Sequence, residues 1–461
     1  MRYTLTFTED AFDVLTRHLL SGATTERAAY LLCASSTTAT ETRLLVRSVL
    51  PVMDADVIAA SATHMSIAGR SVLRAIKAGA LQKESFVFVH SHPPEYPHHS
   101  PQDDLEETVL FRTVYTRMHH EAVHASLVIS SQDTVVGRVW LSDGTTIPID
   151  RVRILGNRFR FIRSEPGTEP LPAFADRQIR AFGPDIQRLL KELTVGVVGL
   201  GGTGSAIVEQ LARLGVGHLV VSDGQMLEAS NVNRVYGSRL SDDGAKKAAL
   251  VERMIAELGV GTRLTAIAKP ISFRSVLEQF RECDVVFCCT DDEFSRSLLT
   301  RLAIYYVIPV FDMAVQVDSE NGIIRGVEGR VTTLLPGTPC LYCRNRISAS
   351  GVRAQSLEET DPEAAKALRA EGYIPELADP APSVIAFTSA VASSAINEFL
   401  HRLTGYLGSE RASSEVIHRF GDTRLSTNAR MPKPDCFCSQ VKHVGRGDRS
   451  LFLDLRWRSE L

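Results

Sequence analysis

Two histidines and a downstream aspartate form the pattern in this chain that most directly indicates chemistry. His90 and His92 are separated by one residue, and Ser100 and Asp103 follow in the order Ser-Pro-Gln-Asp. Imidazole nitrogens and carboxylate oxygens are zinc ligands, and a set of three leaves the fourth position open, as a catalytic zinc site requires. The spacing therefore predicts a catalytic Zn²⁺ held by His90, His92 and Asp103.

The residues before the histidines predict how these ligands are positioned. The apolar run Ser85–Val89 is typical of a buried strand. Side chains alternate along a strand, so His90 and His92 would share one face at its end. Two consecutive prolines then end the strand and begin a loop that would return Asp103 to the metal.

This arrangement resembles the JAMM metalloprotease motif, His-x-His-x(7)-Ser-x-x-Asp, with every fixed position present. The resemblance implies an α/β metalloprotease domain in which Ser100 helps to hold the oxyanion. It also implies an upstream glutamate that acts as general base. Glu26, in the segment Thr25–Leu32, fits this place best, and Glu41 is the alternative.

Three further polar residues lie close to the motif. We expect His98 and His99 to be solvated or to face substrate, and Asp104 to be a weaker ligand candidate than Asp103. A strand that ends in ordinary hydrogen-bonded histidines is the alternative to a metal site.

A glycine-rich turn indicates a second site. The apolar run Thr194–Val198 leads into a Gly-x-Gly-x-x-Gly sequence that opens a helix. The glycines of this turn are Gly199, Gly201, Gly202 and Gly204. They permit a tight turn and a close approach of the backbone to phosphate, which the helix N-terminus attracts. Asp223 ends the next strand, where a carboxylate would hold ribose hydroxyls, so the turn alone predicts a site for ATP or NAD.

Polar residues beyond this turn favour ATP. They are Asn231, Asn233, Arg234, Lys246, Lys247 and Asp291, with Arg177 ahead of the first strand. Together with the turn they resemble the ThiF/MoeB/HesA family and the adenylation domain of ubiquitin-activating enzymes, over about residues 175–440. The resemblance implies that ATP and Mg²⁺ serve to adenylate the C-terminal glycine of a ubiquitin-like or sulfur-carrier protein, with release of pyrophosphate.

The charges of these residues suit the reaction that the resemblance implies. The phosphate-facing residues would be Asn233, Arg234 and Lys247, with Lys246 as the alternative to Lys247. Asp291 would bind Mg²⁺, which prefers carboxylate oxygen. In the family the early arginine reaches across a dimer, so Arg177 implies a homodimer.

Four of the eight cysteines form two close pairs, Cys340-x-x-Cys343 and Cys436-x-Cys438. They resemble the structural zinc site of that family, although the family usually has two residues inside each pair. The N-terminus has no apolar signal segment, so we expect a cytoplasmic protein whose paired thiols bind zinc and do not form disulfides. Four free thiols are the alternative.

Ubiquitin-activating enzymes also keep a nucleophilic cysteine in a crossover segment, and this chain has none between Cys343 and Cys436. Three interpretations stay open: direct transfer of the adenylate to another protein, an oxyester on a hydroxyl within about residues 345–383, or a remote cysteine. The hydroxyl candidates are Ser348, Ser350, Ser356 and Thr360. A hydroxyl is a poor nucleophile without an activating base, which favours direct transfer.

The chain has 461 residues, enough for two to three domains. Its net charge of -3, and its lack of a long apolar run, favour neither nucleic acid nor membrane as a partner. We expect a JAMM-type α/β domain over 1–145, a linker over 146–174, and a basic tail over 443–461. Residues 175–442 would form a Rossmann-like, doubly wound domain with a largely parallel sheet.

The combined interpretation is a bifunctional enzyme of a prokaryotic ubiquitin-like pathway. One domain would adenylate the carrier's terminal glycine, and the other would cut a peptide or isopeptide bond after it. A conjugating-enzyme-like acceptor is a further expected partner. The alternatives are sulfur-carrier activation for cofactor biosynthesis and a noncatalytic scaffold with one inactive domain.

Overall fold

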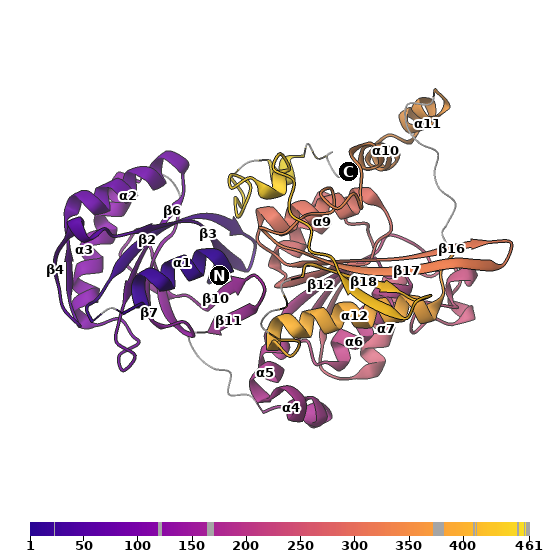
Figure 1. The fold of residues 1–461 in the computed structure, drawn as a ribbon, viewed down its shortest axis with the longest axis horizontal. Coiled ribbons are helices and arrows are strands. Elements are labelled where there is room, and N and C mark those ends of the chain that lie inside the picture. Colours follow the sequence, from indigo (N-terminus) through magenta and orange to yellow (C-terminus); the bar gives the residue numbers. More distant parts are fainter. Residues whose placement is uncertain are drawn as a thin grey trace. The chain divides into compact units, whose positions relative to one another are not determined.

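The computed structural model describes the chain apart from residues 23, 119–121, 164–169, 372–381, 409–410, 412, 450, 456 and 458–461. It divides into two compact units (Figure 1). Unit 1 comprises Met1–Thr168, Tyr305–Val307 and Val444–Asp454, and unit 2 comprises Glu169–Ile304, Ile308–His443 and Leu455–Leu461. Among the described helices, none is both long and apolar enough to cross a membrane.

Unit 1 is built on a mixed sheet that has nine strands over its described residues, in the order β11-β10-β1-β3-β2-β6-β7-β8-β9. The strands are β1 (Arg2–Thr8), β2 (Ala28–Thr37), β3 (Glu41–Pro51), β6 (Ser85–Ser91), β7 (His124–Ser131), β8 (Thr134–Trp140), β9 (Thr146–Pro148), β10 (Arg151–Leu155) and β11 (Phe159–Arg163). β2 and β6 pair antiparallel, with Ala28 opposite His90. The residues just before β2 therefore lie beside the end of β6.

Helices cover both faces of this sheet (Figure 1). α1 (Glu9–Leu20) buries Phe12 and Leu15 in a core with β1, β2, β3 and β7. α2 (Gly69–Gln82) and α3 (Pro101–Arg117) bury Ile76 and Phe111 against the opposite face, together with Phe86 of β6. A short hairpin of β4 (Val57–Ala60) and β5 (Met65–Ile67) stands apart from the main sheet.

Residues 146–163, expected to be part of a linker, instead form β9, β10 and β11. β10 pairs in parallel with β1 and antiparallel with β11. Val152 and Ile154 of β10 are buried in the unit 1 core, and this alternation of apolar residues is the physical reason that the segment is a strand. The Pro/Gly-rich stretch 164–169 lies outside the described residues.

The segment Val444–Asp454, expected to be a surface tail, is part of unit 1. Arg449 donates a hydrogen bond of 2.8 Å to Glu84 and one of 2.7 Å to the carbonyl of Gln82, the last residue of α2. The backbone N–H of Thr37 donates to Asp448 over 2.9 Å. These contacts bind the segment to the end of α2 and the end of β2.

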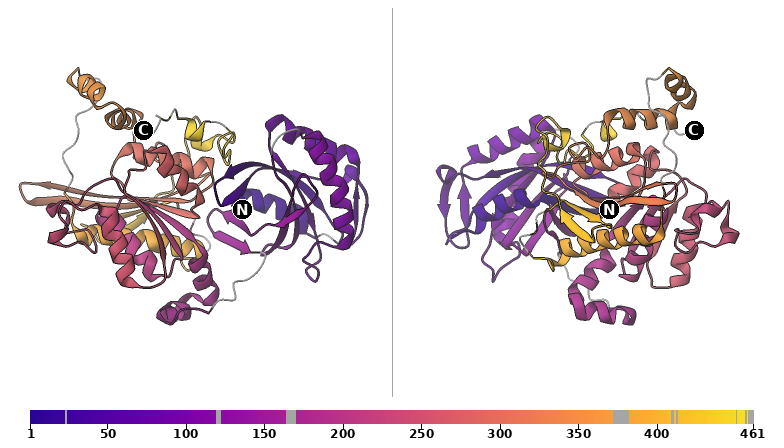
Figure 2. Two further views of the ribbon diagram at one scale, coloured as in Figure 1. Left: turned by 180° about the vertical axis from the view of Figure 1, so that it is seen from behind. Right: turned by 45° about the vertical axis from the view of Figure 1, so that its right-hand side comes forward.

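Unit 2 has an eight-stranded sheet over its described residues, in the order β14-β13-β12-β15-β16-β17-β18-β19. The strands are β12 (Thr194–Val198), β13 (His218–Ser222), β14 (Arg263–Ile267), β15 (Val285–Cys288), β16 (Val310–Glu320), β17 (Ile323–Leu334), β18 (Glu415–Arg419) and β19 (Arg424–Thr427). The pairs from β14 to β16 are parallel and those from β16 to β19 are antiparallel. β16 and β17 extend beyond their neighbours as a long hairpin (Figure 2).

The described part of unit 2 also contains α-helices outside the crossover region. They are α4 (Asp176–Phe182), α5 (Pro184–Glu192), α6 (Gly202–Arg213), α7 (Lys247–Leu258), α8 (Arg274–Gln279), α9 (Glu293–Tyr305) and α12 (Ile385–Thr404). α6, α7 and α12 lie on one face, and α9 lies on the other (Figure 1). The parallel half of the sheet confirms the expectation of a Rossmann-like α/β fold, but the sheet is mixed as a whole.

The charged, alanine-rich residues 358–371 of the crossover region predict a single helix. The structure differs from this prediction. Two helices occur there, α10 (Ala349–Thr360) and α11 (Pro362–Ala370). Asp361 caps α11 by accepting from the N–H of Ala364, and Pro362 occupies the first turn. A proline in a helix interior would remove a hydrogen bond, so the chain ends one helix and starts another. Residues 372–381 lie outside the described part of the chain.

Candidate functional site

The structure brings His90, His92 and Asp103 together in unit 1. The Nε2 atoms of the two histidines are 3.1 Å apart, and the carboxylate of Asp103 lies 3.3 Å from one and 3.4 Å from the other. Ligand atoms at zinc distance in a tetrahedron are about 3.4 Å apart. The donor set and its spacing therefore fit a zinc ion.

Ser100 and Asp103 form the start of α3. Ser100 caps the helix by accepting from the N–H of Asp103, and its own N–H donates to the Asp103 carboxylate over 2.6 Å. The Ser100 hydroxyl also donates to this carboxylate over 2.8 Å. This capping box fixes the direction of Asp103 towards the histidines.

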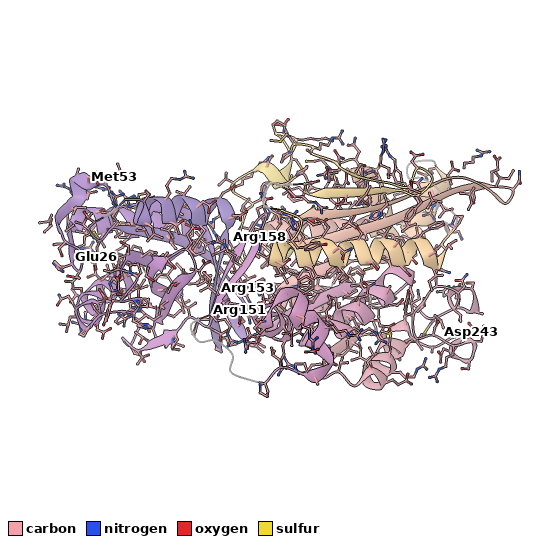
Figure 3. All side chains as sticks on the ribbon, turned by 60° about the horizontal axis from the view of Figure 1, so that its bottom comes forward. Glu26, Met53, Arg151, Arg153, Arg158 and Asp243 are labelled. Carbon is pink, nitrogen blue, oxygen red and sulfur yellow. The ribbon has the colours of Figure 1, made fainter. Side chains whose placement is uncertain are left out.

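The two glutamates proposed as general base occupy different surroundings. Glu26 lies two residues before β2, inside unit 1 (Figure 3), and its Oε1 is 3.6 Å from His92 Nε2. Burial raises the pKa of Glu26 to about 7, with the charge of Asp103 acting in the same direction. Glu41, in contrast, accepts hydrogen bonds from Thr4 and Arg43 at the start of β3 and pairs with Arg153 of β10.

Glu26 borders two pockets of unit 1. One, of about 970 Å³, is lined by His92, Asp13, Arg17 and Gln132 among others. The second, of about 340 Å³, runs along β4 and includes Ala60. Open space therefore lies next to Glu26.

A buried polar cluster beside the histidines was not predicted from the sequence. His99, expected to be solvated or substrate-facing, has a side chain only 9% exposed, and its Nε2 lies 3.8 Å from Glu107. Burial and the charge of Arg138 lower the pKa of His99 to about 3. Arg138 also pairs with Glu107 over 2.6 Å. The sequence gives no signal for this cluster because its members come from separate elements.

The glycine-rich turn of unit 2 joins β12 to α6 as expected. A Cβ on Gly204 would lie 1.8 Å from the carbonyl oxygen of Gly199, so only glycine fits this close approach. Asp223 follows β13, and its carboxylate accepts from the N–H of Leu200 and of Gln225, each over 2.7 Å. The expected ribose-binding carboxylate therefore lies directly against the turn.

The expected phosphate-binding residues lie close to this turn. Arg234 is adjacent to Gly202, where an added Cβ would meet its side chain at 3.3 Å. Arg234 donates to Asn233 over 3.2 Å, and Asn231 lies in the preceding turn. Lys247 is buried and donates to Gln225 over 2.7 Å, while its alternative, Lys246, is exposed. Lys247 as the phosphate-facing lysine, with Lys246 as its alternative, stays a prediction.

Several other expected residues of unit 2 are exposed. Asp291 follows β15 and is exposed, and Arg177 is exposed on α4. Ser348 caps α10 and donates to Glu293 over 3.1 Å. The Thr360 side chain lies outside the described part of the chain.

Asp312, which the sequence did not single out, is completely buried beside β15, where Arg296 approaches it to 3.3 Å.

The four paired cysteines meet at one point of unit 2. Their Sγ separations are 3.8 Å for Cys340 and Cys343, and 3.5 Å both for Cys340 and Cys436 and for Cys343 and Cys438. Tetrahedral zinc thiolates have Sγ atoms about 3.8 Å apart. The single residue within the second pair therefore does not prevent a four-thiolate arrangement, and the cluster fits zinc.

A Rossmann-like α/β unit with a glycine-rich turn and nearby cations defines a nucleotide-binding class of protein. Residues 175–439, more than half of the chain, match the model of the ThiF family. The chain therefore belongs to the ThiF family.

The chain also matches curated relatives over part of its length. The chain is 32% identical over 161 residues to the SAMP-activating enzyme E1 of Haloferax volcanii, covering 35% of this chain and 56% of that protein. It is 28% identical over 167 residues to the sulfur carrier protein ThiS adenylyltransferase of Bacillus subtilis, covering 35% and 46%. The match thus spans about half the length of these relatives. Among solved structures, Escherichia coli MccB with ATP is 16% identical, with a TM-score of 0.45 over 61% of this chain and 77% of that one.

Proposed function

We propose that unit 2 adenylates the C-terminal glycine of a ubiquitin-like or sulfur-carrier protein at the expense of ATP. The observation that supports this most is the glycine-rich turn with Asp223, Arg234 and Lys247 around it, in a chain of the ThiF family. The names of the two curated relatives, an activating enzyme and a carrier adenylyltransferase, suit this substrate class.

The residues would act on ATP by charge and position. The N–H groups at the start of α6 and the side chains of Arg234 and Lys247 would hold the phosphates. Asp223 would hold the ribose, and Asp291 would hold Mg²⁺. Arg177, exposed on α4, would serve a second copy of the chain in a homodimer.

The test is ATP–pyrophosphate exchange with a panel of ubiquitin-like proteins that end in glycine. Exchange that requires a carrier supports the proposal, and Asp291→Ala should abolish it. Asp243→Ala changes an exposed aspartate of the same unit (Figure 3) and should leave it unchanged. No exchange with any carrier, while ATP still binds, would contradict carboxylate adenylation for the panel tested.

We propose that unit 1 is a zinc-dependent peptidase that cuts after the same terminal glycine. The supporting observation is the spacing of His90, His92 and Asp103, with Glu26 beside them. A bound Zn²⁺ would supply a Lewis acid and a more acidic water. Glu26 would accept a proton at Oε1, and the raised pKa of its carboxyl suits proton transfer near neutral pH. Ser100 would support the oxyanion.

A carrier protein extended beyond its glycine by a reporter tests this second activity. Cleavage should require zinc, stop with a chelator, and be absent in Asp103→Ala. Cleavage that persists in Asp103→Ala would contradict the proposed site. The zinc cluster of unit 2 is proposed to be structural, held by Cys340, Cys343, Cys436 and Cys438.

A further inference from the structure

Two buried polar atoms near the proposed zinc site have no hydrogen-bond partner among the described residues: His90 Nδ1 and Glu107 Oε1. Nδ1 is the nitrogen of His90 that remains when Nε2 faces His92 and Asp103. On a metal-ligating histidine this nitrogen carries the proton, so it is a donor. A carboxylate oxygen is an acceptor. The two unpartnered atoms are therefore chemically complementary.

The other oxygen of Glu107 is held by neighbours on two strands. Oε2 accepts from Ser126 of β7 over 2.6 Å, and from Trp140 of β8 over 3.2 Å. Arg138 of β8 donates two hydrogen bonds to it, at 2.9 Å and 2.6 Å. Glu107 itself is 2% exposed. The orientation of its carboxylate is therefore fixed. Oε2 accepts all of these hydrogen bonds, and Oε1 is available to accept another.

The available oxygen lies beside His99, whose ring contacts the ring of His90. Oε1 is 3.8 Å from His99 Nε2, and the His99 ring packs edge-on against the His90 ring, with 6.4 Å between centroids. On another side, Phe88 stacks on His90 with 5.3 Å between centroids. His90 is thus confined by two rings, and the Glu107 carboxylate lies next to one of them.

On the basis of the proposed zinc site of unit 1, we propose that Glu107 is a positioning residue for His90. Oε1 accepts from His90 Nδ1, directly or through one water, when Nε2 binds zinc. Metal-ligating histidines almost always donate their second nitrogen to a carboxylate, a carbonyl or a water, and this contact fixes the ring and strengthens the metal bond. Glu107 reaches zinc only through His90 and takes no part in the reaction.

The experiment measures the zinc affinity of the full-length protein by competition with a chelator. Asp103→Ala identifies the part of the zinc binding that belongs to unit 1, as distinct from the cysteine cluster. Glu107→Gln keeps the shape of the side chain but removes its charge, and we expect zinc at this site to bind about 10- to 100-fold more weakly. Glu107→Asp keeps the charge beside Arg138 but shortens the side chain, so it replaces Glu107→Gln if that variant does not fold.

Trp140→Phe is the matched control. It removes a donor to Oε2 and weakens the same cluster, but leaves Oε1 unchanged. We expect it to lower the melting temperature without changing the zinc affinity. With Co²⁺ in the site, the Glu107 variants should shift the visible absorption bands of the metal, and Trp140→Phe should not.

The outcomes separate the two proposals. Unchanged zinc affinity in a folded Glu107 variant, or an equal loss in Trp140→Phe, would overturn the positioning role and leave the peptidase intact. If Asp103→Ala binds as much zinc as the unchanged protein, unit 1 has no zinc site at these residues. That result would also overturn the role of Glu107.

Discussion

Glu26 Oε1 lies 3.6 Å from His92 Nε2, although Glu26 precedes β2 by two residues and His92 directly follows β6. The antiparallel pairing of these strands, with Ala28 opposite His90, creates this proximity. A carboxylate beside the donor set, and not part of it, has the place that a general base needs. The pairing register therefore links the fold of unit 1 to its proposed chemistry.

Glu26→Gln should slow cleavage strongly without loss of zinc. The amide cannot accept the proton, and removal of a general base costs about 10²- to 10⁴-fold in rate. Cleavage of the extended carrier and zinc content, measured on the same preparation, check this. If Glu26→Gln cleaves at the rate of the unchanged protein, the base is another residue.

Glu41→Gln should unfold unit 1 more easily but leave the rate of cleavage by folded protein unchanged. Glu41 is buried with Arg43 and Arg153, and Arg151 lies two residues from Arg153 on the same strand (Figure 3). Loss of one partner from a buried ion pair costs about 3–5 kcal/mol. Chemical unfolding checks the stability, and loss of cleavage in folded Glu41→Gln would restore it as the candidate base.

The same carboxylate predicts a pH dependence of stability. Burial raises the pKa of Glu41, but the charges of Arg153 and Arg43 outweigh burial and hold it well below its usual range. Because the folded-state pKa is below the unfolded one, the stabilisation is complete at neutral pH and is lost as pH falls below about 4.3. Unfolding at a series of pH values should show a smaller loss in acid for Glu41→Gln. An equal loss in both proteins would contradict this role.

Cys436→Ser should release zinc and destabilise unit 2. A structural zinc contributes directly to folding, because the four thiolates are brought together only in the folded chain. Metal analysis and thermal unfolding check both effects. Cys283→Ala is the matched control, since Cys283 is completely buried in the same unit but is not part of the cluster. It should lower stability and retain the zinc.

The sequence predicts those parts of the structure that depend on neighbouring residues. The run Thr194–Val198 followed by glycines specifies β12 and its turn, and Ser85–Val89 specifies most of β6. Contacts between distant residues were not predictable. Arg138 is a charged residue in a strand pattern, and only the folded sheet shows that it pairs with Glu107 and that its charge helps to lower the pKa of His99. The same limit applies to the segment Val444–Asp454, because its basic residues predicted a tail exposed to solvent.

Gly447→Ala should destabilise unit 1 by loosening the segment Val444–Asp454. Gly447 has a φ of +56°, and a Cβ there would lie 2.2 Å from the backbone oxygen of Ser35 on β2. The matched control is Gly144→Ala, which has a φ of +87° in the same unit but no atom within 4 Å of the added Cβ. Gly144→Ala measures the backbone strain alone, about 1–2 kcal/mol.

The clash with Ser35 adds to this strain in Gly447→Ala. Overpacking typically costs about 1–3 kcal/mol, so the total for Gly447→Ala should be about 2–5 kcal/mol. Chemical unfolding of both variants measures the difference between them. Because β2 also positions Glu26 beside His92, the same variant should release zinc from unit 1 at a lower denaturant concentration. Equal stability of the two alanine variants would mean that the segment does not support unit 1.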